Sequence, residues 1–147
     1  MKLKDNKMLF SSSPTIDEIN SSLITPTGQK KSVEFDGKKF ITTGIHVTNN
    51  GDIFICGQDW KMTSGVKVLG AGSDAHRVYQ GLFMLQFDAN GKYKRNYGLK
   101  LDQKKYMGGF TDGLTPNMIP AFSNIEESVD GKKLYWLISM CKAVDKD

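Results

Sequence analysis

The chain has 147 residues, 39% of them hydrophobic and 24% charged, with a formal net charge of +4. This length predicts about one domain, and the hydrophobic content excludes an intrinsically disordered chain. The 20 Lys and Arg residues are scattered and do not gather on one element, which argues against nucleic-acid binding. No run is apolar and long enough to cross a bilayer, and residues 1–7 lack the apolar stretch of a signal peptide, so we expect a soluble chain.

The N-terminal quarter contains short turn signals and little helical periodicity. Pro26-Thr27-Gly28 and Asp36-Gly37 are typical of turns. The segment Ile16-Asp17-Glu18-Ile19 could begin a short turn, but it is too short to predict a helix. We therefore expect residues 7–35 to form three strands.

Stronger turn signals separate the apolar runs in the rest of the chain. Asn49-Asn50-Gly51-Asp52, Asn90-Gly91 and Asp130-Gly131 each supply the positive φ of a tight hairpin. Continuous apolar runs between such turns predict strands covered on both faces, whereas the alternation in residues 92–97 predicts a solvent-facing outer strand. The predicted strands are residues 40–48, 52–59, 79–88, 92–99, 125–128 and 134–140.

Aligning Gly51 with Gly131 reveals a weak internal repeat with an offset of 80 residues, in which Ile45 matches Ile125. Both copies consist of a strand, a turn and a buried strand. The repeat predicts a single all-β domain over residues 1–147, built of antiparallel four-stranded meanders. Its parts are a partial unit at residues 7–35, a full unit at 39–99, a loop at 100–120 and a partial unit at 121–147.

The residues Asp130-Gly131-Lys132-Lys133-Leu134-Tyr135-Trp136 resemble the Asp-Gly-Lys-x-Leu-Tyr-aromatic signature of TolB-like β-propeller repeats. The stretches 51–57 and 82–91 are similar to the blade pattern of related bacterial propellers. The resemblance covers about a third of the chain and implies a partial propeller of about two blades in an extracytoplasmic or cell-envelope location. It implies contacts with a protein partner or with the remaining blades of a parent chain. An offset of 80 residues exceeds the usual ~40–50 per blade, which implies long insertions.

The residues Gly70-Ala71-Gly72-Ser73-Asp74-Ala75 fit the dinucleotide-binding pattern G-x-G-x-x-A, and Asp88 follows 18 residues after Gly70. Only the six residues 76–81 separate Ala75 from the continuous apolar run that starts at Leu82, which is too few for the crossover helix of that fold. The sequence therefore favours a flexible Gly-rich loop and predicts no cofactor.

Two long loops, at residues 60–78 and 101–120, are the expected places for binding. Their aromatic side chains either form a contact patch for a protein or a sugar ring or fold back to cap the blades. His46 is expected to be a satisfied structural histidine within a strand, and no cluster predicts a catalytic or metal site. The candidate binding residues are Trp60, His76, Arg77, Tyr106 and Phe110.

The two cysteines, Cys56 and Cys141, end apolar runs and are expected to be small buried hydrophobic residues. A disulfide between them stays an open alternative, because spacing alone cannot establish the pairing.

The main functional hypothesis is a non-catalytic propeller-type module that mediates protein–protein contacts. The alternative is a glycan-binding or glycan-processing propeller fragment that stacks loop aromatics on sugar rings, and a nucleotide-dependent enzyme is disfavoured. Because a half-unit would leave strand edges and the apolar side chains of Leu134, Trp136 and Ile138 uncovered, we also expect a homo-oligomer or association with the rest of a parent chain.

Overall fold

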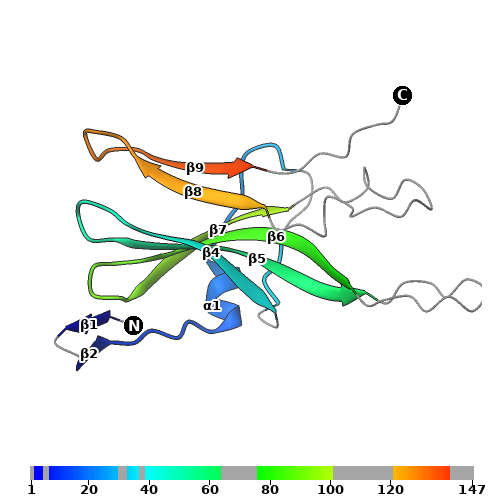
Figure 1. Ribbon diagram of the computed structural model, residues 1–147, viewed down its shortest axis with the longest axis horizontal. Coiled ribbons are helices and arrows are strands. Elements are labelled where there is room, and N and C mark those ends of the chain that lie inside the picture. The colour runs from blue at the N-terminus through cyan, green and yellow to red at the C-terminus, as the bar shows by residue number, and fades with distance from the viewer. Residues whose placement is uncertain are drawn as a thin grey trace, which may run out of the picture.

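The computed structural model describes residues 2–4, 7–29, 33–36, 39–63, 76–100 and 121–139. These residues form an all-β fold with one short helix and three sheets (Figure 1). The elements, in chain order, are β1 (Lys2–Lys4), β2 (Lys7–Phe10), α1 (Ile16–Ser21), β3 (Leu23–Ile24), β4 (Phe40–Val47), β5 (Ile53–Thr63), β6 (His76–Phe87), β7 (Tyr93–Lys100), β8 (Phe122–Glu127) and β9 (Leu134–Ser139).

The central sheet has five strands in the order β3-β7-β6-β5-β4. Strands β4 to β7 form an antiparallel meander, which confirms the four strands predicted within residues 39–99. Strands β5 and β6 are longer than expected, because Trp60 pairs with Tyr79 and Thr63 pairs with His76. Both ends of the predicted loop at residues 60–78 therefore belong to the sheet.

The N-terminal segment differs from the three strands expected in residues 7–35. It contains β2, which pairs with β1, then helix α1, and then the two-residue strand β3, which runs parallel to β7. A capping box starts the helix: the Thr15 hydroxyl accepts from the Glu18 N–H at 3.2 Å, and the Glu18 carboxylate accepts from the Thr15 N–H at 2.8 Å. Reciprocal caps of this kind satisfy two backbone donors that a helix start leaves without partners.

One face of the central sheet, here called the helix face, is covered by α1 and by residues 33–36. Ile19, Val33 and Phe35 pack on Phe83 of β6. The ring of Phe35 meets those of Phe83 and Phe40 edge-on, at centroid distances of 5.2 and 5.5 Å. Alternation along the strands places Ile45, Val47, Ile53, Ile55 and Gly57 on this same face.

The opposite face, here called the hairpin face, is covered by the antiparallel hairpin β8–β9, which lies along β4 in Figure 1. Ile125 of β8 packs with Phe54, Cys56 and Met84, and Trp136 of β9 joins this cluster. Ile125 and Trp136 are therefore on the covered side of the hairpin. Because the central sheet is covered on both faces, β5 and β6 can be apolar without alternation, as the sequence indicates.

Polar contacts also fix the hairpin on the sheet. The backbone N–H of Ala121 donates to the buried Gln58 side chain at 2.9 Å. The hydroxyls of Thr43 and Ser123 lie 2.9 Å apart. These two residues are 80 positions apart, the offset of the sequence repeat, so equivalent positions of two repeat units touch.

The three hairpin turns share a glycine with positive φ, although the third turn is one residue longer than the other two. Gly51, Gly91 and Gly131 have φ values of +89°, +78° and +67°, and they recur every 40 residues. Each donates its N–H to the carbonyl three residues earlier, at 2.8–2.9 Å. The turns of the hairpins β4–β5, β6–β7 and β8–β9 thus recur at a spacing of 40 residues, and the sequence offset of 80 spans two such intervals.

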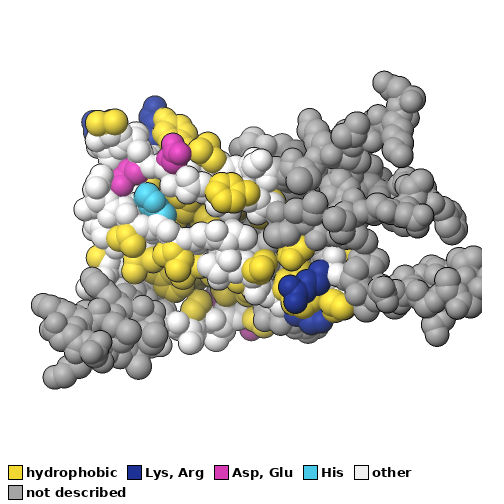
Figure 2. All heavy atoms as spheres, viewed as in Figure 1, with side chains coloured by type: hydrophobic (Ala, Val, Ile, Leu, Met, Phe, Trp, Pro, Cys, Tyr) yellow, Lys and Arg dark blue, Asp and Glu magenta, His cyan; other side chains and the backbone are white. Residues whose placement is uncertain are grey.

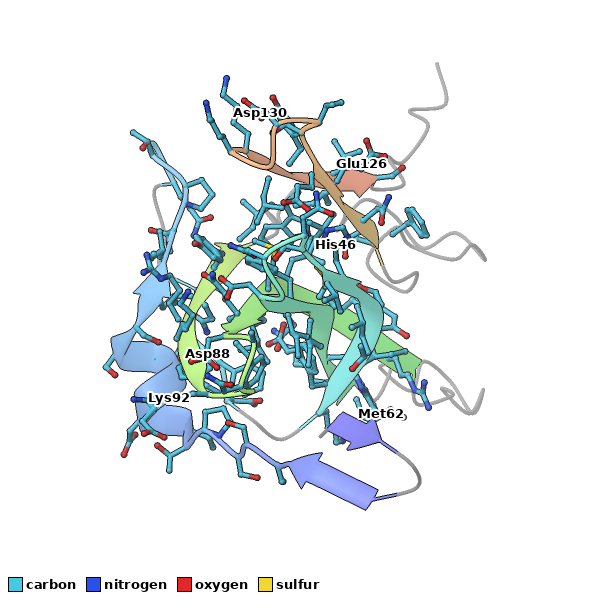
Figure 3. The ribbon with its side chains drawn as sticks, turned by 90° about the vertical axis from the view of Figure 1, so that its left-hand side faces the viewer. His46, Met62, Asp88, Lys92, Glu126 and Asp130 are labelled. Atoms are coloured by element: carbon cyan, nitrogen blue, oxygen red, sulfur yellow. The ribbon has the colours of Figure 1, made fainter. Side chains whose placement is uncertain are left out.

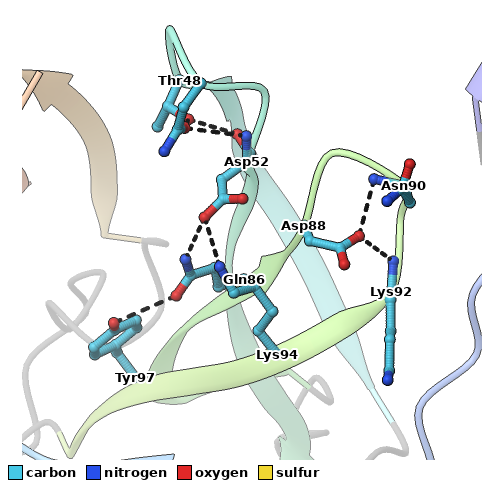
Figure 4. Close-up of polar contacts among 9 residues, drawn as sticks. Thr48, Asp52, Gln86, Asp88, Asn90, Lys92, Lys94 and Tyr97 are labelled. Atoms are coloured by element: carbon cyan, nitrogen blue, oxygen red, sulfur yellow. Dashed lines mark hydrogen bonds and ion pairs between the residues drawn. The ribbon is translucent and has the colours of Figure 1, made fainter.

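The carboxylate of Asp52, at the end of the first turn, contacts strands β6 and β7 (Figure 4). It accepts from the Gln86 side chain at 2.8 Å and from the Lys94 ammonium at 3.0 Å. Burial raises the pKa of Asp52, but the hydrogen bonds from Lys94 and Gln86 outweigh it and hold the pKa below its usual value. This contact links strands β5, β6 and β7 near their turn ends.

Close packing on the helix face predicts an unequal cost for two glycine substitutions. A Cβ on Gly57 would meet the ring of Phe40 and lie 2.6 Å from the carbonyl oxygen of Ile41, whereas a Cβ on Gly44 would be 3.4 Å from its nearest neighbour. We expect Gly57→Ala to lower the free energy of unfolding in urea by about 1–3 kcal/mol, the usual cost of overpacking, and Gly44→Ala to change it much less. Equal effects would contradict the close approach of Phe40.

Candidate functional site

Two of the candidate binding residues from the sequence, Trp60 and Arg77, meet at the end of the β5–β6 ladder. The guanidinium carbon of Arg77 lies 4.5 Å from the centroid of the Trp60 ring, and the Lys39 ammonium lies 5.0 Å from it. Arg77 is exposed and Trp60 half-buried. Figure 2 shows Lys and Arg side chains over hydrophobic ones at that end of the described surface.

The ladder explains this contact. Trp60 pairs with Tyr79, and Arg77, two residues before Tyr79, pairs with Met62. Arg77 therefore points to the same face as Trp60, at the diagonal distance that long side chains can span. The exposed loop aromatic expected at position 60 is in fact a strand residue with cations over its ring, so a sugar ring would have to displace them in order to stack there.

The other candidate residues are not brought into this cluster by the described structure. His76 begins β6 opposite Thr63, and its side chain is not described. Tyr106 and Phe110 lie outside the described residues, as does the Gly-rich loop at residues 70–75.

His46 lies within β4, as expected, and points toward the hairpin β8–β9 (Figure 3). Its Nε2 atom is buried and has no hydrogen-bond partner among the described residues, which differs from the satisfied histidine that the sequence indicates. Trp136 Nε1, across the same contact between sheet and hairpin, also lacks a partner within the described part.

Sequence reasoning missed Asp59, the residue before Trp60. Its side chain is only 7% exposed and accepts a hydrogen bond from the Gly81 N–H. Burial, and secondarily the negative charge of Asp36, raise the pKa of the Asp59 carboxyl to about 6, although the Gly81 N–H and the charge of Lys100 pull it down. Perturbed carboxyls often mark functional sites. Within the described ranges, however, no group of three His, Cys, Asp or Glu side chains could hold a metal ion.

Cys56 is buried and free, and burial raises the pKa of its thiol to about 11. Since the thiolate is the reactive form, this cysteine is a packing residue and not a nucleophile. Cys141, its possible disulfide partner, lies outside the described residues.

Among the described strand residues, the most exposed large apolar side chains lie on β4 and on the hairpin β8–β9. The side of the hairpin turned away from the sheet, here called the outer face, carries Phe122, Tyr135 and Leu137, which are 67%, 50% and 48% exposed. On the helix face, Ile45 and Val47 are 67% and 60% exposed, because α1 and residues 33–36 cover β6 but not this end of β4. Figure 2 shows hydrophobic side chains around β4 and on the hairpin.

Neither apolar surface was assigned to a site from the sequence, although a signal was present. The apolar side chains of β9 were expected to be uncovered, and Leu134, Trp136 and Ile138 were the residues named. The register turns these three toward the sheet, where Trp136 and Ile138 are half-buried but Leu134 stays 38% exposed, and it leaves Tyr135 and Leu137 outside. The sequence identified the apolar strand but could not decide which of its faces is covered.

Among the described residues, no helix is long and apolar enough to cross a membrane. Comparison with protein-family models, with curated proteins and with solved structures gives no match to this chain.

The cation–π cluster predicts a measurable coupling between Trp60 and Arg77. In a double-mutant cycle with Trp60→Leu and Arg77→Gln, we expect the two changes to be coupled by about 0.5–1 kcal/mol in the free energy of unfolding. Lys61→Gln, an exposed neighbour on the ladder, serves as the matched control and should show no coupling to Trp60→Leu. A coupling of zero for Arg77 would mean that the ring and the guanidinium do not interact in solution.

The raised pKa of Asp59 predicts a pH-dependent stability. Because the folded state binds this proton more tightly than the unfolded state, Asp59 favours folding least above its folded pKa, and stability should fall as the pH rises from about 4 to 7. The loss should approach about 3 kcal/mol, at roughly 1.4 kcal/mol per tenfold change in proton affinity. Asp59→Asn should remove this slope in urea melts, and the exposed control Asp17→Asn should keep it. A retained slope in Asp59→Asn would assign the pH dependence to another group.

Proposed function

We propose that the chain is a non-catalytic β-propeller-type module whose two open apolar faces mediate protein–protein contacts. The observation that carries the proposal is the exposure of large apolar side chains on both: Phe122, Tyr135 and Leu137 on the outer face, and Ile45 and Val47 on the helix face. Contiguous apolar patches are uncommon on monomers and mark places where another surface binds.

The arrangement of the strands supports the propeller-type interpretation. A four-stranded antiparallel meander, β4 to β7, is followed by a hairpin that stacks on its face. Stacked sheets of this kind, with equivalent positions such as Thr43 and Ser123 in contact, are what repetition of one unit around a common axis produces.

The site residues favour contact over chemistry. The buried carboxyl of Asp59 hydrogen-bonds the backbone of the next strand, and the thiol of Cys56 is packed between sheet and hairpin. Trp60, the residue on which the glycan-binding alternative depends, already has two cations over its ring.

Site-specific photo-crosslinking in the cells that naturally produce the chain tests this proposal. A benzophenone amino acid at Phe122 or Val47 should yield covalent adducts with protein, because both side chains lie on the open faces. The same group at Asn90, an exposed residue of the β6–β7 turn, is the matched control and should yield few. Equal yields at all three positions would show that the apolar faces are not contact surfaces.

A further inference from the structure

We infer that further copies of this chain cover the open faces. The exposed end of the helix face of one copy lies on the outer face of β8–β9 of the next copy, head to tail. The inference rests on the proposed function and names its partner. It is carried by an interface that the chain already contains, between the hairpins β4–β5 and β8–β9.

The residues of the two hairpins correspond to one another when each strand is numbered outward from its turn. Val47 pairs with Ile53 beside the first turn, and Glu127 pairs with Leu134 beside the third. Two residues further out, the pair Ile45–Ile55 corresponds to the pair Ile125–Trp136. Because β9 begins one residue later after its turn, Phe54 corresponds to Tyr135 and Cys56 to Leu137.

This equivalence gives each hairpin the same two faces. In β4–β5, the helix face corresponds to the covered side of β8–β9, and the hairpin face corresponds to its outer face. Within the chain, the covered side of β8–β9 sits on the hairpin face of β4–β5, through Ile125 against Phe54 and Cys56. The observed interface therefore joins two unlike faces of one repeated unit.

The two kinds of face that form this interface each have an exposed counterpart elsewhere on the molecule. The outer face of β8–β9 has no further hairpin on it among the described residues, and the end of the helix face on β4 has none either. A second copy would join them. Its Ile45, which stands where Ile125 stands, would pack against Tyr135 and Leu137, which stand where Phe54 and Cys56 stand.

The side chains that would meet are complementary at the turn as well. Within the chain, the Glu127 carboxylate accepts from the backbone N–H of Asn49 at 3.0 Å. At the equivalent place between two copies, Val47 of one copy would take the position that Glu127 has within the chain. Val129 of the other copy would take the position of Asn49. Val47 is 60% exposed and Val129 fully exposed, so an apolar contact would stand where the chain itself makes a polar one.

Contacts between unlike faces have a consequence for assembly. Each copy binds one neighbour through its helix face and another through its outer face, so association can continue from copy to copy. It stops only when the rotation between copies closes a ring. A contact between two identical faces would instead stop at a dimer. The two cases are separated by blocking one face at a time.

Size-exclusion chromatography with light scattering of the purified chain at micromolar concentration tests the inference. The wild-type chain should have at least twice the monomer mass of 16.4 kDa. Ile45→Lys blocks the helix face and Leu137→Lys blocks the outer face, and each variant alone should be monomeric. An equimolar mixture of the two variants should form a 1:1 dimer, because one intact face of each kind remains. Asn90→Lys, at an exposed turn position, is the charge-matched control and should assemble as the wild type does.

Several outcomes would overturn the inference. A monomeric wild-type chain, or a dimer formed by either blocked variant alone, excludes head-to-tail assembly. Circular dichroism melts establish that each variant is folded, and the pair Val47→Lys and Tyr135→Lys repeats the test if one of the first pair is not. A monomeric chain that still crosslinks to a different protein through Phe122 would keep the proposed function and exclude the second copy. A monomer without adducts would exclude both.

Discussion

Strands β5 and β6 carry large apolar side chains on both faces, and a sheet of this kind is stable in water only when both faces are covered. The chain supplies the two covers from opposite ends of its sequence. Ile19, Val33 and Phe35 come from the N-terminal segment, and Ile125 and Trp136 come from β8–β9. The N-terminal helix and the C-terminal hairpin are therefore held in place by the same two strands.

The sequence predicted the sheet well because its signals are local. Asn-Gly and Asp-Gly turns fix the ends of β4 to β9, and β-branched or aromatic runs fill the strands between them. It failed where a signal was short or the decisive contact was distant. The capping box of Thr15 and Glu18 lies in a segment too short to show helical periodicity, and the pairing of β3 with β7 joins residues more than 70 positions apart.

The candidate site was predicted less completely, for physical reasons. Trp60 and Arg77 were both named from the sequence, but only the β5–β6 ladder shows that they contact each other. Asp59 gives no signal in the sequence, because its raised pKa results from burial that only the fold creates. Which side of β9 faces outward is also undetermined by its continuous apolar composition, since a shift of one residue exchanges the two faces.

The contrast between the covered and the open faces follows from this arrangement. Where β8–β9 meets the sheet, polar contacts at Ser123, Glu127 and Gln58 fix the register and the Ile125 cluster supplies the apolar burial. The open faces lack an equivalent of the Glu127 contact, because Val47 and Val129 stand at the corresponding positions, although the outer face also carries Asn124 and Glu126. The proposed interface between copies would therefore depend on shape and apolar burial, and it would form only at sufficient concentration of the chain. In the proposed head-to-tail assembly, the hairpins would thus supply both the fixed contact within the chain and a weaker, concentration-dependent contact between chains.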